Sequence, residues 1–234
     1  MKALIQRENE IFSILKDFEN SGLKYVLIGG YAVSAYKHRF SVDADLCIGK
    51  KDIEAFREML KSRKFEIEKR RVLEDIYSGE FESYTNKSEL PVTVDLMINS
   101  VASRQTDASL SFEEIYKTSK AARITGIEDE AEARIAAKEV LIALKIHAAR
   151  LTDARDIVAL CMDIDFKEVA KYVERGNLEV ISSNLDILLK SIKSENFKDS
   201  FKGVFSIEKL PKGNIDNAIK LLEDMKKAVR AKKG

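Results

Sequence analysis

The chain has 234 residues, and its 40 Lys and Arg nearly balance its 39 Asp and Glu, giving a formal net charge of +1. This balance argues against bulk nonspecific affinity for nucleic acid, although it permits a local basic groove. No signal peptide and no apolar run of membrane-spanning length is evident, and Cys47 and Cys161 are best interpreted as small core residues in a reducing compartment, so we expect a cytoplasmic protein without membrane contact.

The first predicted elements are a helix, a buried strand and a second helix. Residues 4–18 carry apolar side chains at helical spacing, residues 25–28 form a short apolar run, and residues 31–37 again predict a helix. Gly29 and Gly30 separate the strand from the second helix, and glycines there let the backbone approach a ligand beside the free N–H groups of a helix start. An anion-binding turn is one interpretation, and a simple chain reversal is the other.

Aspartates interrupt two predicted strands. In residues 41–48 strand alternation places Asp43 and Asp45 on one face, and in residues 91–98 Asp95 is the only charge, opposite an apolar face. Like charges this close are unfavourable unless a cation separates them, and Mg²⁺ or Mn²⁺ accepts carboxylate oxygens. The alternative is that the first two aspartates face solvent and that Asp95 is an edge charge preventing aggregation. Because aspartate is disfavoured in strands, we favour metal binding.

The remaining elements complete a prediction of the α+β class. Further strands of one mixed sheet are expected over residues 65–69, 71–77 and 81–84, and helices over residues 51–61 and 112–117. From about residue 130 the pattern predicts only helices, over residues 138–149, 153–162, 166–174, 178–192 and 215–229. We therefore expect an α/β-type core, with a mixed sheet and flanking helices, over residues 1–118, followed by a mainly helical region over residues 119–234.

The order IGGYA, then RFSVDAD, then a distant single aspartate in a strand resembles the polymerase-beta-like nucleotidyltransferase superfamily. The resemblance implies that Gly29 and Gly30 bind the triphosphate of an NTP, that Asp43 and Asp45 hold metal ions, and that Asp95 completes the catalytic and metal-binding set. It also implies an in-line attack by an acceptor hydroxyl on the α-phosphorus, with pyrophosphate leaving and two metal ions stabilising both oxygens. Asp95 would help to deprotonate the hydroxyl.

A short basic run, Lys37, His38 and Arg39, lies between the glycines and the first acidic strand. The common fate of such a run is a solvated loop. Arg39 matches the superfamily's arginine, and its planar fork suits phosphate, so we expect Arg39, with Ser41 of the same motif, to bind the nucleotide. His38 is expected to be incidental.

Residues 135–160 narrow the resemblance to the abortive-infection, AbiEii-type toxin-like branch. Lys145 lies on an otherwise apolar helix, and the resemblance implies that its ammonium, together with Arg150, contacts a nucleotide phosphate and that Lys145 contributes to catalysis. The alternative is a lysine whose stem packs on the core while its head reaches water.

Asp153 and Asp156 lie three residues apart on one helical face. Either Asp153 caps a helix and Asp156 lies in its first turn, where carboxylates are favoured, or the two belong to the branch's pattern of a basic residue followed by D-x-x-D. Both registers depart from that pattern, because Thr152 precedes Asp153 and Ala159 stands where a second aspartate would follow Asp156. Asp156 remains a catalytic candidate.

The predicted function is a metal-dependent, toxin-like enzyme that moves an NMP from an NTP to an acceptor hydroxyl. An RNA or tRNA 3′ end is the expected acceptor and an antitoxin protein the expected partner, while a small molecule or a protein hydroxyl is an open alternative acceptor. Two other functions stay open: a catalytically inactive module that binds nucleotide or a partner with the same fold, and an antitoxin-paired regulator.

Overall fold

The computed structural model describes residues 1–72 and 79–232 of the chain. The chain folds into two compact units. The first comprises Met1–Val101 and Leu110–Ala137, and the second comprises Ala102–Ser109 and Lys138–Gly234. The domain boundary predicted after residue 118 falls within the first of these units.

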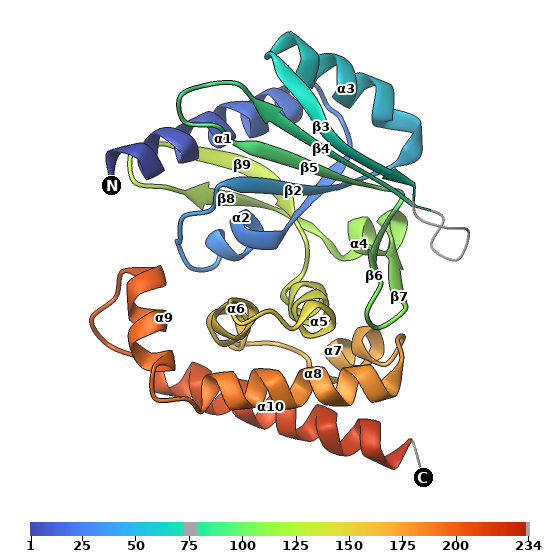
Figure 1. The fold of residues 1–234 in the computed structure, drawn as a ribbon, viewed down its shortest axis with the longest axis vertical. Helices are drawn as coiled ribbons and strands as arrows, with labels where there is room; N and C mark the ends of the chain where they lie inside the picture. Colours follow the sequence, from blue (N-terminus) through green and yellow to red (C-terminus); the bar gives the residue numbers. More distant parts are fainter. Residues whose placement is uncertain (73–78, 233–234) are drawn as a thin grey trace. The chain divides into compact units, whose positions relative to one another are not determined.

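Within the described residues, the first unit is built on a seven-stranded mixed sheet with the strand order β3-β4-β5-β2-β1-β9-β8 (Figure 1). The strands are β1 (Tyr25–Ile28), β2 (Asp43–Ile48), β3 (Phe65–Val72), β4 (Glu80–Asn86), β5 (Thr93–Ile98), β8 (Lys120–Thr125) and β9 (Glu130–Ile135). The pairs β2–β5 and β1–β9 are parallel, and the other neighbours are antiparallel. The predicted α+β class with a mixed sheet is confirmed.

Helices α1 (Lys2–Asn20) and α3 (Ile53–Ser62) cover one face of this sheet (Figure 1). Their rings Phe18 and Phe56 lie 5.0 Å apart between centroids, and Phe18 also contacts Tyr25 of β1. Tyr25 lies opposite Ile48 of β2, so α1 and α3 cover the apolar face of the sheet, away from the aspartates. The first unit also contains α2 (Gly29–Ser34), a 3-10 turn (Lys50–Asp52) and α4 (Phe112–Thr118).

Most predicted elements of the first unit are confirmed with shifted ends. α2 begins at Gly29 itself rather than at residue 31, and it ends at Ser34. β3 is one strand where two were predicted, because a bulge between Ile67 and Lys69 lets the chain remain paired with β4. The end of the second predicted strand, residues 73–77, lies outside the described residues.

The expectation of helices alone from residue 130 onward was wrong, because Glu130–Ile135 is strand β9. Its sequence, EAEARI, is rich in residues that favour helices, but Ala131, Ala133 and Ile135 alternate and are buried. Pairing with β1 and β8 on either side overrides this weak local preference. β8 and the two-stranded sheet of β6 (Ser100–Ser103) and β7 (Ala108–Ser111) were also not predicted.

The second unit is helical, as predicted for most of this region. Its described helices are α5 (Lys138–Ala148), α6 (Asp153–Leu160), α7 (Phe166–Val173), α8 (Leu178–Ile192), α9 (Phe197–Phe205) and α10 (Lys212–Ala231). α8 and α10 run side by side, and α5 packs against α6 and α7 (Figure 1). α9 was not predicted, although Phe197, Phe201 and Phe205 line one of its faces. None of the described helices is long and apolar enough to cross a membrane.

Candidate active site

Three aspartates lie on one face of the neighbouring strands β2 and β5. In the parallel register Asp45 is directly opposite Asp95, and Asp43 is opposite Thr93. Neighbouring strands lie about 4.8 Å apart, so the carboxylates stand close to one another. The three aspartates are half-buried, whereas the residues that alternate with them are fully buried, namely Ala44, Leu46, Val94 and Leu96. The predicted alternation is therefore confirmed.

Two of these carboxylates accept hydrogen bonds from serine hydroxyls. Ser41 Oγ donates to Asp43 Oδ1 at 2.6 Å, and Ser83 Oγ donates to Asp95 Oδ1, also at 2.6 Å. Ser83 lies on β4 directly opposite Asp95 and is 8% exposed. Ser41 was predicted as a nucleotide contact, whereas Ser83 was missed, because only the pairing register of β4 with β5 could have drawn attention to it.

The glycine turn between β1 and α2 lies directly against the acidic strand. Gly29 has a positive φ of 65°, and an added Cβ would come within 1.9 Å of Asp45 Oδ2. A Cβ on Gly30 would come within 2.4 Å of Ser41 Oγ and 3.0 Å of Arg39 Nη2. α2 has only six residues, so its helix dipole is weak. The glycine turn would favour anion binding mainly because a ligand can approach its backbone closely.

The electrostatic environment of Asp95 is unfavourable to its ionised form. Burial raises the pKa of Asp95 and the charge of Asp43 raises it further, while the Ser83 hydrogen bond and the charge of Lys69 lower it, with a raised pKa as the net result. Asp45, Asp95, Ser83 and Lys69 are successive cross-strand partners on β2, β5, β4 and β3. Lys69 therefore lies on the edge strand in the same row across the sheet as Asp95. Candidate functional sites often have such a perturbed carboxylate.

The donor chemistry of the three aspartates fits a divalent cation. Carboxylate oxygens are the ligands that Mg²⁺ and Mn²⁺ prefer, and a cation would relieve the repulsion between Asp43 and Asp95. In residues 1–72 and 79–232, however, no group of three or more His, Cys, Asp or Glu side chains is arranged to hold a metal ion. The aspartates therefore fit a metal by ligand type and by strand position, without forming a closed ligand group.

The loop between α2 and β2, residues 35–42, carries Arg39 and Ser41 and is bonded back to α2 at two points. The Arg39 backbone N–H donates to Ser34 Oγ at 3.3 Å, and the Tyr31 hydroxyl donates to the Ser41 carbonyl at 2.9 Å. Arg39 Nη1 also donates to the carbonyl of Phe40 at 3.2 Å. These bonds bring the Arg39 guanidinium to the glycine turn, where it was predicted to bind phosphate.

Lys145 of α5 forms an ion cluster with two aspartates of α6 in the second unit. Its Nζ lies 3.0 Å from Asp153 Oδ1 and 2.7 Å from Asp156 Oδ2, and its side chain is 13% exposed. Asp153 Oδ2 also accepts the backbone N–H of Arg150 at 2.9 Å. The alternative interpretation of Lys145, with its head in water, was therefore wrong.

The cluster holds Lys145 in its charged form. Burial lowers the pKa of Lys145, but the charges of Asp156 and Asp153 more than offset it, so the pKa is raised. Asp156 lies in the first turn of α6, as the helix-start interpretation of the sequence expected, whereas the cap position is occupied by Thr152 and Asp153 is the first residue of the helix. The nucleotide-binding and catalytic roles of Lys145, Arg150 and Asp156 stay predictions.

The side chains of His147, Cys47 and Cys161 are buried. His147 Nδ1 lies 2.8 Å from Thr106 Oγ1, its Nε2 lies 3.1 Å from the Tyr172 carbonyl oxygen, and burial lowers its pKa. Burial also raises the pKa of the Cys47 and Cys161 thiols to about 12. Because a neutral thiol is a poor nucleophile, both cysteines are core residues, as predicted.

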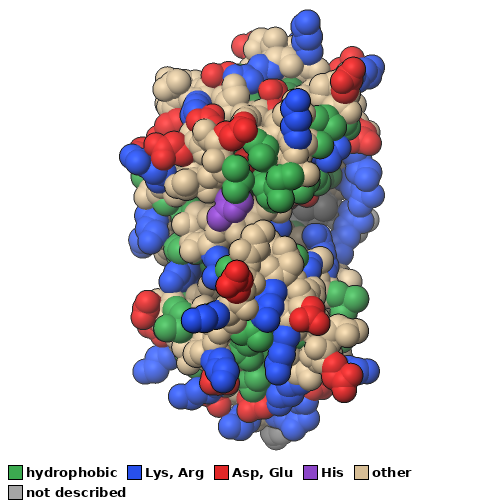
Figure 2. All heavy atoms as spheres, turned by 90° about the vertical axis from the view of Figure 1, so that its left-hand side faces the viewer, with side chains coloured by type: hydrophobic (Ala, Val, Ile, Leu, Met, Phe, Trp, Pro, Cys, Tyr) green, Lys and Arg blue, Asp and Glu red, His purple; other side chains and the backbone are tan. Residues whose placement is uncertain are grey.

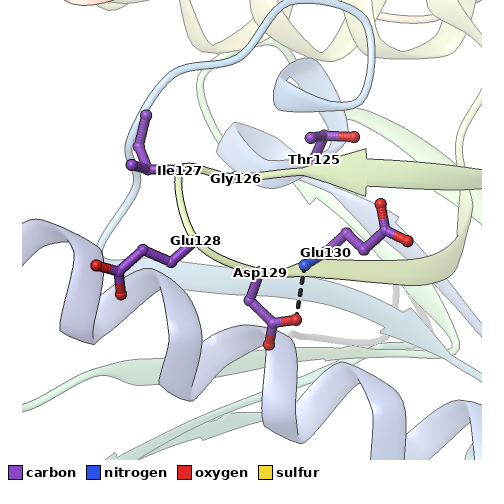
Figure 3. Close-up of a pocket in the computed structure, with 6 residues that line it drawn as sticks. All are labelled: Thr125, Gly126, Ile127, Glu128, Asp129 and Glu130. Atoms are coloured by element: carbon purple, nitrogen blue, oxygen red, sulfur yellow. Dashed lines mark hydrogen bonds between the residues drawn. The ribbon is translucent and has the colours of Figure 1, made fainter.

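A surface hollow lies at the turn between β8 and β9, lined by Thr125, Gly126, Ile127, Glu128, Asp129 and Glu130 (Figure 3). Inside it, the Glu130 backbone N–H donates to Asp129 Oδ1 at 2.8 Å. None of the predicted site residues lines this hollow. On the face in Figure 2, basic and acidic side chains are intermixed, in keeping with the near-neutral net charge.

The chain matches no model of a known protein family, and no curated protein matches it significantly. Among solved structures it is similar to the lincosamide antibiotic adenylyltransferase LnuA, bound to lincomycin, with 19% identity and a TM-score of 0.46 over 67% of this chain and 98% of LnuA. It is also similar to a candidate nucleotidyltransferase from H. pylori, with 18% identity and a TM-score of 0.42 over 99% of this chain and 98% of the other. JHP933 from Helicobacter pylori gives 19% identity and a TM-score of 0.43 over 100% and 96% of the two chains. At these TM-scores the likenesses carry no argument about activity.

Proposed function

We propose that this chain is a metal-dependent nucleotidyltransferase of the polymerase-beta-like superfamily, which moves an NMP from an NTP to an acceptor hydroxyl. The observation that carries the proposal is the pairing of Asp45 with Asp95 on neighbouring parallel strands, with Asp43 on the same face. Gly29 lies against Asp45 with no side chain between the backbone and the carboxylate. Carboxylates that can hold metal ions, beside a glycine turn that a triphosphate can approach closely, suit metal-assisted nucleotidyl transfer.

Each part of the candidate site has a role in this reaction. The three aspartates would hold Mg²⁺ or Mn²⁺, which when bound would stabilise the attacking and leaving oxygens. Arg39, Ser41 and the glycine turn hold the triphosphate of the NTP. Asp95 accepts the proton of the acceptor hydroxyl, whose oxygen bonds to the α-phosphorus as pyrophosphate leaves.

We further propose a toxin-like role, with an RNA or tRNA 3′ end as acceptor and an antitoxin protein as partner. This part rests on the resemblance of the segment around Lys145 to the AbiEii-type branch. In that role Lys145, Arg150 and Asp156 act on the nucleotide. A phosphate would have to share the Lys145 ammonium with Asp153 and Asp156, which already bind it.

The second candidate function is a catalytically inactive module that binds nucleotide or a protein partner. One observation favours it: Lys145, which was predicted to contact a nucleotide phosphate, is bound by two aspartates of its own unit. This candidate function predicts metal-dependent NTP binding without transfer.

The experiment incubates the protein with each α-labelled NTP, with Mg²⁺ or Mn²⁺ and total RNA or tRNA, and measures label transfer. The test variant is Asp43→Asn/Asp45→Asn. The matched control is Asp129→Asn, which removes a carboxylate of the same unit that pairs with Lys16 at 2.7 Å outside the candidate site. We expect transfer by the wild type and the control, and none by the double variant.

The other outcomes separate the alternatives. NTP binding that the double variant abolishes, without transfer by the wild type, would favour the binding module. Label recovered on a small molecule or on protein would keep the chemistry and reject the RNA acceptor. Neither binding nor transfer with any NTP would overturn the site assignment.

A further inference from the structure

We propose that Glu8 and His38 are positioning residues, which hold the loop of residues 35–42 so that Arg39 and Ser41 stand ready at the glycine turn before nucleotide binds. The proposal rests on the proposed function, because it concerns the nucleotide side of the same site. Glu8 comes from α1 and His38 from the loop itself. No pattern in the sequence indicated a role for Glu8, and His38 was expected to be incidental.

Glu8 is an ionisable residue with 0% exposure. Its Oε1 lies 2.9 Å from His38 Nε2, and its Oε2 accepts the Ile127 backbone N–H at 2.9 Å. Gly126 makes room for it, since an added Cβ would come within 2.3 Å of Glu8 Oε2. A buried carboxylate is strongly unfavourable unless its oxygens have partners, and here each oxygen has one. Glu8 therefore joins α1, the site loop and the β8–β9 turn at one point.

The Glu8 contact fixes the residue next to Arg39 in the chain. The His38 ring packs edge-on against Phe40, with centroids 5.2 Å apart, so the residues on either side of Arg39 hold each other. The Tyr31 hydroxyl holds the carbonyl of Ser41 at 2.9 Å. With its neighbours fixed, the Arg39 guanidinium loses little further freedom when a phosphate binds, which favours affinity.

A second tie between α1 and the same turn provides a matched control. Lys16 Nζ lies 2.7 Å and 2.8 Å from the two carboxylate oxygens of Asp129, in a contact that involves no residue of the loop. Glu8→Gln and His38→Gln weaken the contact between Glu8 and His38, whereas Asp129→Asn weakens the contact between Lys16 and Asp129. Comparing them separates positioning of the loop from a general loosening of α1.

The first measurement is hydrogen exchange of the amides of residues 37–42 in nucleotide-free protein. We expect exchange to accelerate about tenfold in Glu8→Gln and in His38→Gln, and to remain unchanged in Asp129→Asn. This measurement does not depend on any activity of the protein.

The second measurement is transfer kinetics with ATP, CTP, GTP and UTP in the presence of Mg²⁺. In both test variants we expect the KM for the preferred NTP to rise about tenfold while kcat changes less than about twofold, because the loop acts on binding rather than on chemistry. The double variant Glu8→Gln/His38→Gln should be no worse than the poorer single variant, since the two residues share one contact.

Wild-type exchange and wild-type KM in both test variants would overturn the proposal, and so would equal effects in Asp129→Asn. A wild-type protein that neither binds nor transfers any NTP would end the proposed function, while the exchange measurement would still decide whether Glu8 and His38 hold the loop. His38→Gln guards against misfolding, because His38 is 30% exposed and the substitution leaves the bond from Ile127 to Glu8 in place.

Discussion

Both units bring aspartates close together, and the repulsion between their negative charges is compensated differently in each unit. In the second unit Asp153 and Asp156 are almost fully buried, and Lys145 Nζ lies within 3.0 Å of both carboxylates. In the first unit Asp43 and Asp95 are half-buried, and each accepts a hydrogen bond from a neutral serine hydroxyl.

This difference separates a structural ion cluster from a candidate binding site. A lysine neutralises part of the acidic charge within the fold, whereas a serine orients a carboxylate without neutralising it. Burial and the charge of Asp43 accordingly keep the pKa of Asp95 raised, despite the hydrogen bond from Ser83. A carboxylate that is oriented by a neutral hydroxyl keeps its negative charge when ionised. Such carboxylates are available to a cation or to a reacting hydroxyl.

The largest effect should follow the removal of one carboxylate from the β2–β5 face. Asp95→Asn should lower the rate of label transfer about 10²- to 10³-fold, because it removes both a metal ligand and the proton acceptor. NTP affinity should change little, since the triphosphate contacts remain. Single-turnover transfer, with Asp129→Asn as control, measures this effect. Near-normal transfer by a folded Asp95→Asn protein would exclude Asp95 from the site.

Breaking the ion cluster of the second unit should affect stability rather than chemistry. Lys145→Met should lower the free energy of unfolding by about 3–5 kcal/mol, because it leaves two buried carboxylates without their cation. Urea unfolding measures this change. A loss below about 1 kcal/mol would contradict the structural assignment.

A stability-matched variant then tests the nucleotide role of Lys145. Lys145→Met/Asp153→Asn/Asp156→Asn should regain most of the lost stability, because no buried charge is left without a partner. If this triple variant binds NTP as tightly as the wild type, Lys145 acts only in the fold. A loss of NTP affinity at restored stability would support the toxin-like branch.

A smaller effect should come from the serine that orients Asp95. Ser83→Ala should weaken Mn²⁺ binding and lower transfer about tenfold, while the free energy of unfolding falls by about 1 kcal/mol. Ser83→Thr keeps the hydroxyl and is the matched control. Titration with Mn²⁺ measures the effect independently of transfer, and equal Mn²⁺ affinity in both variants would count against an orienting role.

The smallest effect on activity should come from the thiol on the carboxylate-bearing face. Cys47→Ala should leave transfer within about twofold, because burial raises the pKa of Cys47 to about 12 and keeps the thiol neutral. The folded thiols hold their protons more tightly than unfolded ones, so stability should fall as the pH rises from about 9 towards 12. Thiol labelling at pH 8, with and without urea, should detect both cysteines only after unfolding.

Residue spacing in the sequence correctly predicted the features of the two aspartate clusters that depend on one strand or one helix alone. Alternation along β2 and β5 gave the faces of Asp43, Asp45 and Asp95, and helical spacing placed Lys145 on an apolar helix. These predictions succeed because the spacing of apolar residues indicates which face of a strand, or which side of a helix, is buried.

Contacts between side chains of two different elements could not be predicted from residue spacing. The partners of Lys145 required knowledge of how α5 packs against α6, and the bond from Ser83 to Asp95 required the register of β4. β9 lies in the region from about residue 130 that was predicted to contain only helices, and its pairing with β8 and β1 makes it a strand. Long-range pairing thus decides both the missed strand and the missed site residues.

The parallel pairing of β2 with β5 also bears on how the first unit folds. These strands are neighbours in the sheet, but α3, β3 and β4 separate them in the chain. Contacts between distant segments require a long loop to close and tend to form slowly. A nascent chain that ends before β5 carries the glycine turn and both aspartates of β2, but no third carboxylate beside them. The candidate centre is therefore complete only after the sheet has closed, and a divalent cation present during refolding should speed that last step by reducing the repulsion between the carboxylates.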